Sequence, residues 1–223
     1  MSNVLKVVLL GEAGTGKTCL ISRFTGGLFN PDTMSSLSAQ FITKTIQINN
    51  KPLKFDIWDT AGQEKYRSLA KIFYKDAKVI CLCYDITSKT SFDELKEYWY
   101  EQQTKLNADG DPIFAVVANK YDLFDQQQVN DEEGKEFARQ IKGIFQPTSA
   151  KGNTGIDELF EKIGMKYFDP NYDSNTIESQ EKKEYEQKKI EKKQQKFNEQ
   201  QNKNQGVKLE LGKKKKKGIC ENL

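Results

Sequence analysis

Strand-like and helix-like segments alternate along residues 4–168 of this 223-residue chain, and this alternation limits the possible folds more than any other feature. Strands that alternate with helices build a mostly parallel sheet covered on both faces. A turn at Asn49-Asn50 adds one antiparallel edge strand. Apolar runs predict strands at residues 4–10, 40–49, 51–58, 79–84, 112–118 and 143–146. Helices are expected at residues 17–24, 65–75, 88–106, 131–142 and 155–168. The expected fold is α/β, a six-stranded, mostly parallel sheet with five helices on both faces.

The composition excludes several classes of function. The chain has no His, so it has no His general base, His-containing triad or His metal ligand. Its four cysteines, which include Cys19 and Cys220, have the spacing of neither a zinc site nor a disulfide framework. Cys81 and Cys83 alternate within an apolar run, so we expect both to be reduced core residues on one face of a buried strand.

The charge and composition change after Phe168. Residues 169–223 carry 14 lysines against 10 acidic residues, whereas residues 1–168 have a net charge of −1. The first part therefore lacks the basic surplus of a nucleic-acid binder. Residues 178–201 are almost entirely Glu, Gln and Lys, with isolated apolar residues that follow no heptad. We expect a globular domain over residues 1–168 and a flexible tail over residues 169–223; a helix that forms on a partner is the alternative for the tail.

A phosphate-binding motif lies between the first strand and the first helix. Residues 11–18 read G-E-A-G-T-G-K-T and fit the pattern G-x-x-x-x-G-K-[ST] in the context that this pattern requires. Backbone N–H groups of the loop would surround the β-phosphate, and the helix N-terminus adds partial positive charge. Lys17 would neutralise the β- and γ-phosphates, and the Thr18 hydroxyl would bind Mg²⁺. The expected nucleotide-binding residues here are Ala13, Gly14, Thr15, Gly16, Lys17, Thr18 and Cys19.

The segment W-D-T-A-G-Q-E follows another apolar run, at residues 58–64. Asp59 ends the expected strand and can hold Mg²⁺ through a water molecule. Gly62 lets a backbone N–H group approach a terminal phosphate closely, and Gln63 can orient an attacking water. Alone, the segment could be an ordinary turn between a strand and a loop.

A third group of residues can select the base. Asn119 and Lys120 begin the sequence N-K-Y-D directly after an expected strand, and Asp122 ends it. The Asp122 carboxylate can accept from guanine N1–H and the 2-amino group, whereas adenine offers neither donor. Asn119 can reach the O6/N7 edge of guanine and brace the phosphate-binding loop, and Lys120 can cover one face of the ring. Ser149, Ala150 and Lys151 follow the last strand, where the Ala150 N–H can donate to O6; Phe29 either packs edge-on against the base or lies in the core.

With these motifs in this order, residues 4–168 closely resemble the Ras superfamily of small GTPases, and the Rab branch in particular. The similarity includes L-S-A-Q-F at residues 37–41 and L-K-F-D-I-W-D-T-A-G-Q-E-K-Y at residues 53–66. It also includes F-Y-K-D-A at residues 73–77 and L-C-Y-D-I-T at residues 82–87. Residues 38–45 and 68–70 are most similar to the early-endosomal Rab subgroup.

The resemblance implies a P-loop small GTPase fold and a monomer that hydrolyses GTP to GDP. Gln63 and Lys17 would be catalytic, and Thr18, Ser36 and Asp59 would hold Mg²⁺. Ser36 and Gly62 would contact the γ-phosphate and order the two switch segments, switch I and switch II, for effectors. Other implied partners are a GAP, an exchange factor, and a GDP dissociation inhibitor or escort protein.

Two positions depart from the family pattern in switch I. Ser36 stands where these proteins normally have Thr, and Ser38 stands where they have Gly. The hydroxyl needed for Mg²⁺ is kept at Ser36, but the methyl group that restrains it is lost. These changes leave one alternative function, a nucleotide-locked membrane scaffold that hydrolyses GTP poorly. A second alternative, an adenine-nucleotide enzyme, is disfavoured by Asp122.

The end of the tail predicts attachment to a membrane. Five lysines at residues 213–217 precede Cys220, which is fourth from the end as in a C-a-a-X prenylation signal. The final Leu223 favours a geranylgeranyl group, although polar Glu221 and Asn222 are unusual there. A lipid and a polybasic run together give stable anchoring, because one lipid chain alone binds only marginally. We expect the cytoplasmic face of an intracellular membrane, endosomal or vesicular, with cycling through the cytosol.

Overall fold

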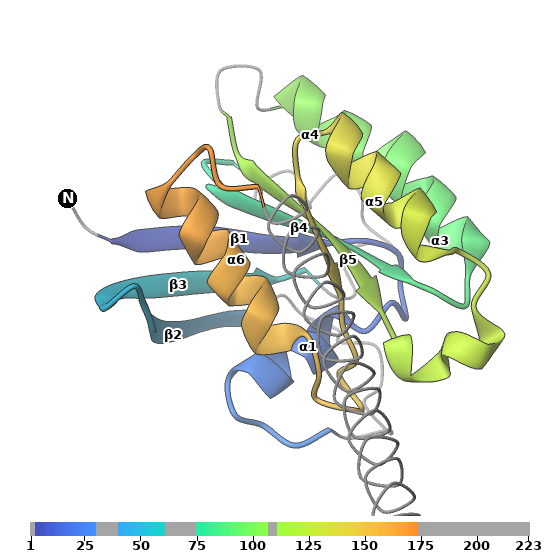
Figure 1. Cartoon of the computed structure of the whole chain (residues 1–223), viewed down its shortest axis with the longest axis horizontal. Helices are drawn as coiled ribbons and strands as arrows, with labels where there is room; N and C mark the ends of the chain where they lie inside the picture. The colour runs from blue at the N-terminus through green and yellow to red at the C-terminus, as the bar shows by residue number, and fades with distance from the viewer. Residues whose placement is uncertain (1–2, 30–39, 61–74, 107–110, 174–223) are drawn as a thin grey trace, which may run out of the picture. The chain divides into compact units, whose positions relative to one another are not determined.

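The chain forms a six-stranded sheet whose strands run in the order β2-β3-β1-β4-β5-β6 (Figure 1). The computed structural model describes residues 3–29, 40–60, 75–106 and 111–173. The antiparallel pair is β2 with β3, and the other neighbouring strands are parallel. The strands are β1 (Val4–Leu10), β2 (Gln40–Ile48), β3 (Lys51–Asp59), β4 (Val79–Asp85), β5 (Ile113–Asn119) and β6 (Ile144–Pro147). The expected α/β fold with one antiparallel edge strand is therefore confirmed.

The helices agree with the sequence pattern, with two differences in winding. The helical segments are α1 (Lys17–Phe24), α3 (Lys89–Glu94), η2 (Leu95–Tyr100), α4 (Glu101–Leu106), η3 (Tyr121–Gln126), α5 (Asp131–Gln140) and α6 (Ile156–Phe168). The single helix expected at residues 88–106 is α3, η2 and α4 in succession, and η2 has the wider π winding. The 3₁₀ segment η3 was not expected from the sequence. The helix expected at residues 65–75 lies almost wholly outside the described residues.

The hairpin between β2 and β3 has the tight turn that the Asn49-Asn50 pair predicts. Ile48 pairs with Lys51, so the loop contains two residues. Asn49 and Asn50 both have positive φ, at 50° and 61°. Positive φ at both central positions defines a type I′ turn, which matches the twist of the flanking strands and which Asn tolerates better than most residues.

Each face of the sheet has its own hydrophobic core, because alternate residues of a buried strand point to opposite faces. In β1, Val7 packs with the core under α1 and α6, and Val8 packs with the core under α3, η2 and α5. Figure 1 shows how the labelled helices lie against the sheet. Phe24 of α1 stacks on Phe160 of α6 with ring centroids 3.5 Å apart. Both faces of the central strands are therefore covered, which explains their continuous apolar runs.

Cys81 and Cys83 lie on one face of β4, as expected. Both are fully buried in the core under α1 and α6, and both are free thiols. Burial raises the pKa of the Cys83 thiol to about 12. The thiolate is the reactive form of cysteine, so neither residue is suited to redox or nucleophilic chemistry.

The neighbouring Tyr84 has a buried hydroxyl with no hydrogen-bond partner among the described residues. Its side chain is fully buried, and burial raises the pKa of Tyr84 above its usual value. The hydroxyl faces Gly134 of α5, where an added Cβ would lie 2.6 Å from it. On folding, the Tyr84 hydroxyl thus loses its hydrogen bonds to water, and no group among the described residues replaces them.

Replacing Tyr84 with Phe is therefore expected to raise the free energy of unfolding by about 1 kcal/mol, because a buried unpaired hydroxyl costs about 1–3 kcal/mol. The matched control is Tyr121→Phe, since the Tyr121 hydroxyl donates to Asp131 Oδ2 at 2.8 Å. That change is expected to lower the free energy of unfolding by about 1 kcal/mol. Urea unfolding measures both values. A loss of stability in Tyr84→Phe as large as in the control would contradict this account.

Candidate functional site

The loop between β1 and α1 takes a path that only glycine allows at two positions. Gly11 has φ 145°, and an added Cβ would lie 2.0 Å from the Cys83 carbonyl oxygen. Gly16 has φ 90°, and an added Cβ would lie 2.4 Å from Asn119 Nδ2. The contact at Gly11 is with backbone, which no change of rotamer relieves, and the positive φ at both positions strains any residue that has a Cβ. The two glycines therefore let the loop lie close against β4 and against Asn119 at the end of β5.

Lys17 is enclosed by the loop that precedes it. Its side chain is only 3% exposed, and its Nζ donates to the carbonyl oxygens of Gly11 and Glu12, each at 2.9 Å. Thr15 Oγ1 donates to the same Glu12 carbonyl at 3.0 Å. The loop is thus folded around the Lys17 ammonium group. Ala13 and Gly14, in the same loop, are exposed.

The Glu12 side chain links this loop to η2, which packs in the core on the other face of the sheet. Trp99 Nε1, from η2, donates to Glu12 Oε1 at 3.2 Å. Trp99 is 1% exposed, so its indole N–H needs a partner within the protein. Sequence reasoning missed this contact. The only signal was an acidic residue inside the glycine-rich loop, whose partner lies 87 positions away.

Thr18 and Asp59 meet at the base of the loop, as the resemblance implies for a metal site. Thr18 Oγ1 lies 2.7 Å from Asp59 Oδ2, although the residues are 41 positions apart. Asp59 is 1% exposed. It ends β3 next to β1, where Leu9 is its partner in the register. Thr60 Oγ1 donates to the Leu9 carbonyl at 2.6 Å and so holds the end of β3 in place. Cys19 follows Thr18 in α1 and is half-buried.

Asn119 connects the candidate base site to the candidate phosphate site. Its Nδ2 donates to the Thr15 carbonyl at 2.7 Å, and its Oδ1 accepts from Thr148 Oγ1 at 3.1 Å. Asp122 Oδ1 accepts from Ser149 Oγ, which itself accepts from the Gly152 N–H at 2.8 Å. Three loops that are distant in the sequence therefore converge at the carboxyl ends of β1 and β5, the usual ligand position in an open α/β sheet.

Lys120 is oriented by an ion pair that sequence reasoning did not anticipate. Its Nζ lies 2.7 Å from Asp85 Oδ2, and its backbone has the left-handed φ of 63°. Asp85 ends β4, and its Oδ1 accepts from Thr87 N at 2.8 Å and Thr87 Oγ1 at 2.7 Å. The stem of Lys120 is thus fixed beside the position where we expect the base.

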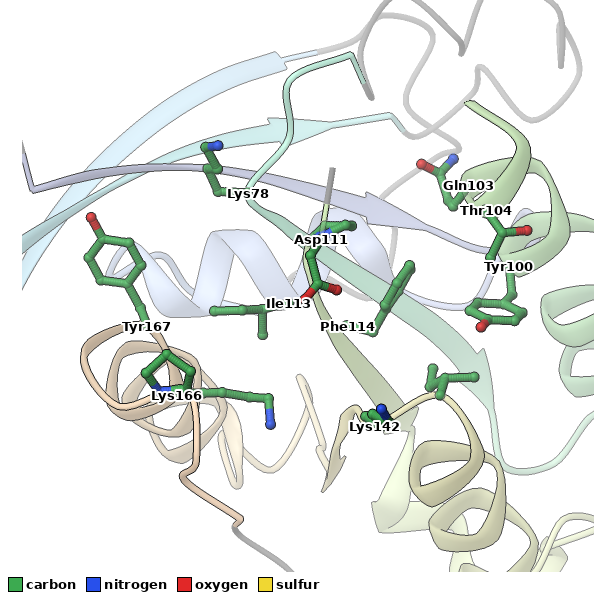
Figure 2. A pocket seen from close by; sticks show the side chains of 13 residues that line it. Lys78, Tyr100, Gln103, Thr104, Asp111, Ile113, Phe114, Lys142, Lys166 and Tyr167 are labelled. Carbon is green, nitrogen blue, oxygen red and sulfur yellow. The ribbon is translucent and has the colours of Figure 1, made fainter. Parts of the chain in front are cut away.

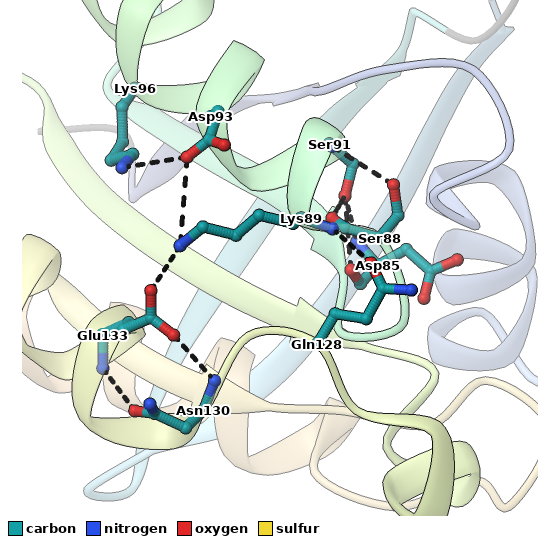
Figure 3. A network of polar contacts seen from close by, with 9 residues as sticks. All are labelled: Asp85, Ser88, Lys89, Ser91, Asp93, Lys96, Gln128, Asn130 and Glu133. Atoms are coloured by element: carbon teal, nitrogen blue, oxygen red, sulfur yellow. Dashed lines mark hydrogen bonds and ion pairs between the residues drawn. The ribbon is translucent and has the colours of Figure 1, made fainter.

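A polar network anchors Asp85 and the starts of two helices (Figure 3). Ser91 Oγ accepts from the Asp85 N–H at 3.1 Å, and Ser88 caps α3 by accepting from Ser91 N. Lys89 is hydrogen-bonded to Glu133, and this contact is the main cause of the raised Lys89 pKa. Glu133 belongs to a capping box with Asn130 at the start of α5. These contacts join α3, α5 and the end of β4 behind the base site.

Arg23 of α1 holds the loop after β6. Its Nε donates to the Ala150 carbonyl at 2.8 Å, and its Nη2 donates to the Lys151 carbonyl at 3.2 Å. Ala150 is 5% exposed and Lys151 is exposed. Phe29 is half-buried in the loop after α1 and belongs to neither hydrophobic core. Three other residues expected at the site, Ser36, Gly62 and Gln63, lie outside the described residues, as does Cys220.

Comparison with known proteins agrees with this arrangement. The sequence model of the Ras family matches residues 6–169. Ras-related protein Rab-22A of Homo sapiens is 40% identical over 173 residues, which cover 77% of this chain and 86% of Rab-22A. Ras-related protein Rab-30 of Homo sapiens is 40% identical over 157 residues, which cover 70% and 76%. Ras-related protein Rab5A of Oryza sativa subsp. japonica is 40% identical over 163 residues, which cover 72% and 78%. The chain therefore belongs to the Ras family of small GTPases, and its relatives place it among the Rab proteins.

Proposed function

We propose that this protein is a Rab-type switch that hydrolyses GTP to GDP and regulates membrane trafficking by recruiting effectors in its GTP form. The observation that carries the proposal is the hydrogen bond from Asn119 Nδ2 to the Thr15 carbonyl, 2.7 Å long. It holds the expected base-selecting loop against the expected phosphate-binding loop, so that one nucleotide could contact both. Lys17 and Asp122 then act on opposite ends of the same ligand.

The residues around Thr18 fit a magnesium ion. Thr18 Oγ1 and Asp59 Oδ2 supply a hydroxyl and a carboxylate oxygen 2.7 Å apart, and Mg²⁺ prefers oxygen ligands and usually retains several waters. Thr18 and Ser36 would bind the ion with their hydroxyls, and Asp59 would hold it through a water. The ion would supply positive charge to the β- and γ-phosphates.

Hydrolysis would depend on Gln63, which orients a water in line with the γ-phosphate, and on Lys17, which stabilises the developing charge. Arg23 is held by the carbonyl groups of Ala150 and Lys151, so this arginine does not supply a finger within the chain. Intrinsic turnover is therefore expected at ~10⁻⁴ to 10⁻² s⁻¹, and a partner GAP would add a factor of roughly 10³–10⁵.

Replacing Gln63 with Leu is expected to lower the intrinsic single-turnover rate about tenfold, because the attacking water loses its hydrogen-bond acceptor. The GTP-bound fraction in cells should rise accordingly. Single-turnover hydrolysis is measured with Mg²⁺ and with a chelator, so that the role of the ion is tested in the same series. Equal rates for the variant and the wild type would remove Gln63 from the mechanism and favour a nucleotide-locked scaffold.

An aromatic pair on β2 and β3 supports an effector surface. Phe41 is 51% exposed, and its ring centroid lies 4.9 Å from that of Trp58. Phe41 ends the expected switch I signature at residues 37–41, and Trp58 begins the expected switch II segment at residues 58–64. Exposed aromatic groups of this kind are typical centres of protein interfaces. This surface would contact the partners of the switch segments, namely effectors, the GAP, the exchange factor and the GDP dissociation inhibitor or escort protein.

Membrane attachment would come from the tail. Among the described residues, no helix combines the length and the hydrophobicity needed to cross a bilayer. A prenyl group on Cys220 together with the five lysines at residues 213–217 would anchor the protein to the cytoplasmic face of an endosomal or vesicular membrane. The lysines would contribute at most about 5 kcal/mol at an anionic surface.

Replacing Cys220 with Ser is expected to move the protein from the membrane fraction to the cytosol, because the polybasic run alone binds reversibly. Fractionation with mass spectrometry of the C-terminal peptide measures both location and modification. Asn202→Ser is the control, since Asn202 lies in the tail but outside the last four residues. An unmodified Cys220 in the membrane fraction would refute the lipid anchor.

A further inference from the structure

A cavity lies at the amino ends of β4 and β5, whereas the candidate nucleotide site lies at the carboxyl ends of the strands. Lys78, directly before β4, and Ile113, at the start of β5, line it. Asp85 and Asn119, at the other ends of the same strands, belong to the base site described above. The cavity has a volume of about 860 Å³, which lies within the usual range for sites of small molecules.

The floor of this cavity is apolar. Ile113 and Phe114 of β5 lie at its centre (Figure 2). Tyr100 of η2 and Ile141, directly after α5, also line it. Tyr100 and Phe114 meet edge to face, with ring centroids 5.3 Å apart. All four side chains are only partly buried, so each has apolar surface that a ligand could cover.

The rim is cationic. Three lysines from different elements, Lys78, Lys142 and Lys166, line the cavity, and Asp111 is the single acidic residue in the lining. Figure 2 shows Lys78 and Lys142 on opposite sides of Ile113 and Phe114. The Lys78 and Lys142 ammonium groups form no ion pair within the part of the chain that the structure describes. Lys166 Nζ donates to the Tyr172 carbonyl at 3.3 Å.

We propose that this cavity binds an amphipathic anion, a molecule with a small apolar body and one phosphate or carboxylate group. Two ammonium groups that form no ion pair with any described residue favour a negative charge at the rim, where three lysines outnumber the single acidic lining residue, Asp111. The apolar floor favours a ligand that covers hydrocarbon, since free phosphate would leave Ile113 and Phe114 in contact with water. An apolar floor combined with polar groups that fix orientation is typical of sites for small ligands.

Hexyl phosphate tests the proposal on the full-length, GDP-loaded protein, because bound GDP keeps the added phosphate away from the loop around Lys17. Titration into ¹⁵N-labelled protein should shift the amide signals of Ile113, Phe114, Ile141 and Lys142. Hexyl phosphate should bind at least tenfold tighter than either hexanol or inorganic phosphate. Hexanoate, compared in parallel, shows whether phosphate or carboxylate is the preferred charge, and binding of either anion supports the proposal.

Two charge reversals, Lys78→Glu and Lys142→Glu, should each weaken the binding of hexyl phosphate at least fivefold. Lys54→Glu is the matched control, because Lys54 lies on β3, pairs with Asp56 and takes no part in the cavity. GDP affinity measured on the same samples reports on folding and on the nucleotide site independently. The proposal is overturned if hexanol binds as tightly as hexyl phosphate, if the shifts avoid these four residues, or if Lys54→Glu weakens binding as much as the two reversals.

Discussion

Replacing Asp122 with Asn is expected to weaken GTP binding by a factor of roughly a hundred or more, and to raise the affinity for XTP by a similar factor. The structure holds this carboxylate in one orientation, because Asp122 Oδ1 accepts from Ser149 Oγ and Ser149 Oγ accepts from the Gly152 N–H. A fixed acceptor discriminates strongly between ligands that offer a donor and ligands that do not.

The direction of the change follows from the hydrogen-bond donors of each base. Guanine presents N1–H and a 2-amino group, and a carboxylate can accept from both. Asn replaces one acceptor oxygen with an NH₂ donor, which would face the 2-amino donor and leave both without a partner. Xanthine has a carbonyl oxygen at that position, so the Asn amide can donate to it. A buried pair of donors is costly, whereas the new pair restores both hydrogen bonds.

Competition of unlabelled GTP, XTP and ATP against a fluorescent nucleotide measures all three affinities. Asp125→Asn is the matched control, since Asp125 is exposed and lies in the same η3 segment. The control should keep the preference for GTP. If Asp122→Asn still prefers GTP to XTP, then Asp122 does not contact the base, and the assignment of this loop is wrong.

The fold was predictable because its signals are local. The continuous apolar run of β5 indicates a strand covered on both faces, and the alternation with helices indicates parallel pairing. The Asn49-Asn50 pair marks the one hairpin, with positive φ at both residues. The positions of Lys17, Asp59 and Asn119 follow from the same reasoning. Asp59 and Asn119 end β3 and β5, and Lys17 begins the helix after β1, so all three lie at the edge where the carboxyl ends of the strands meet.

The winding of two helical segments was not predictable. The pattern of apolar residues at 88–106 is the same for α and π winding to within one residue, so η2 could not be distinguished from its flanks. The η3 segment begins after Lys120, whose left-handed backbone conformation is uncommon for a lysine. That conformation accompanies the ion pair with Asp85, a tertiary contact that no local pattern contains.

The contact of Asn119 with the phosphate-binding loop was expected, but two other side-chain contacts at the site were missed, for the same physical reason. Glu12 with Trp99 and Arg23 with Ala150 join residues 87 and 127 positions apart. No fixed spacing links such residues, since the packing of whole elements brings them together. Trp99, in an amphipathic helix, was predictable as a core residue but not as a hydrogen-bond donor to the phosphate loop.

Replacing Lys17 with Ala is expected to weaken the binding of both GTP and GDP by a factor of about a thousand. Charge-assisted hydrogen bonds contribute about 1.5–3 kcal/mol each, and the ammonium group would make two of them with the phosphates. The structure adds a second cost. Lys17 Nζ donates to the carbonyls of Gly11 and Glu12, so the loop itself loses the donor around which it is folded.

Lys17→Arg separates charge from shape. The guanidinium keeps the positive charge, but it is planar and larger than the enclosed space, in which the Lys17 side chain is only 3% exposed. We therefore expect Lys17→Arg to lose most of the affinity that Lys17→Ala loses. Urea unfolding without nucleotide reports the cost to the loop alone, expected at about 1–3 kcal/mol for Lys17→Ala. Wild-type affinity in either variant would show that the phosphates do not contact Lys17.

The two substitutions together test whether one ligand spans both parts of the site. In an Asp122→Asn background, XTP is the well-bound nucleotide, so a further Lys17→Ala change can be measured against XTP. The loss for XTP should equal the loss for GTP in the Lys17→Ala single variant to within about 0.5 kcal/mol, because distant contacts to one ligand add independently. A much smaller loss would mean that the base and the phosphates occupy different sites. A much larger one would show that the Asn119–Thr15 hydrogen bond, 2.7 Å long, couples the two loops energetically.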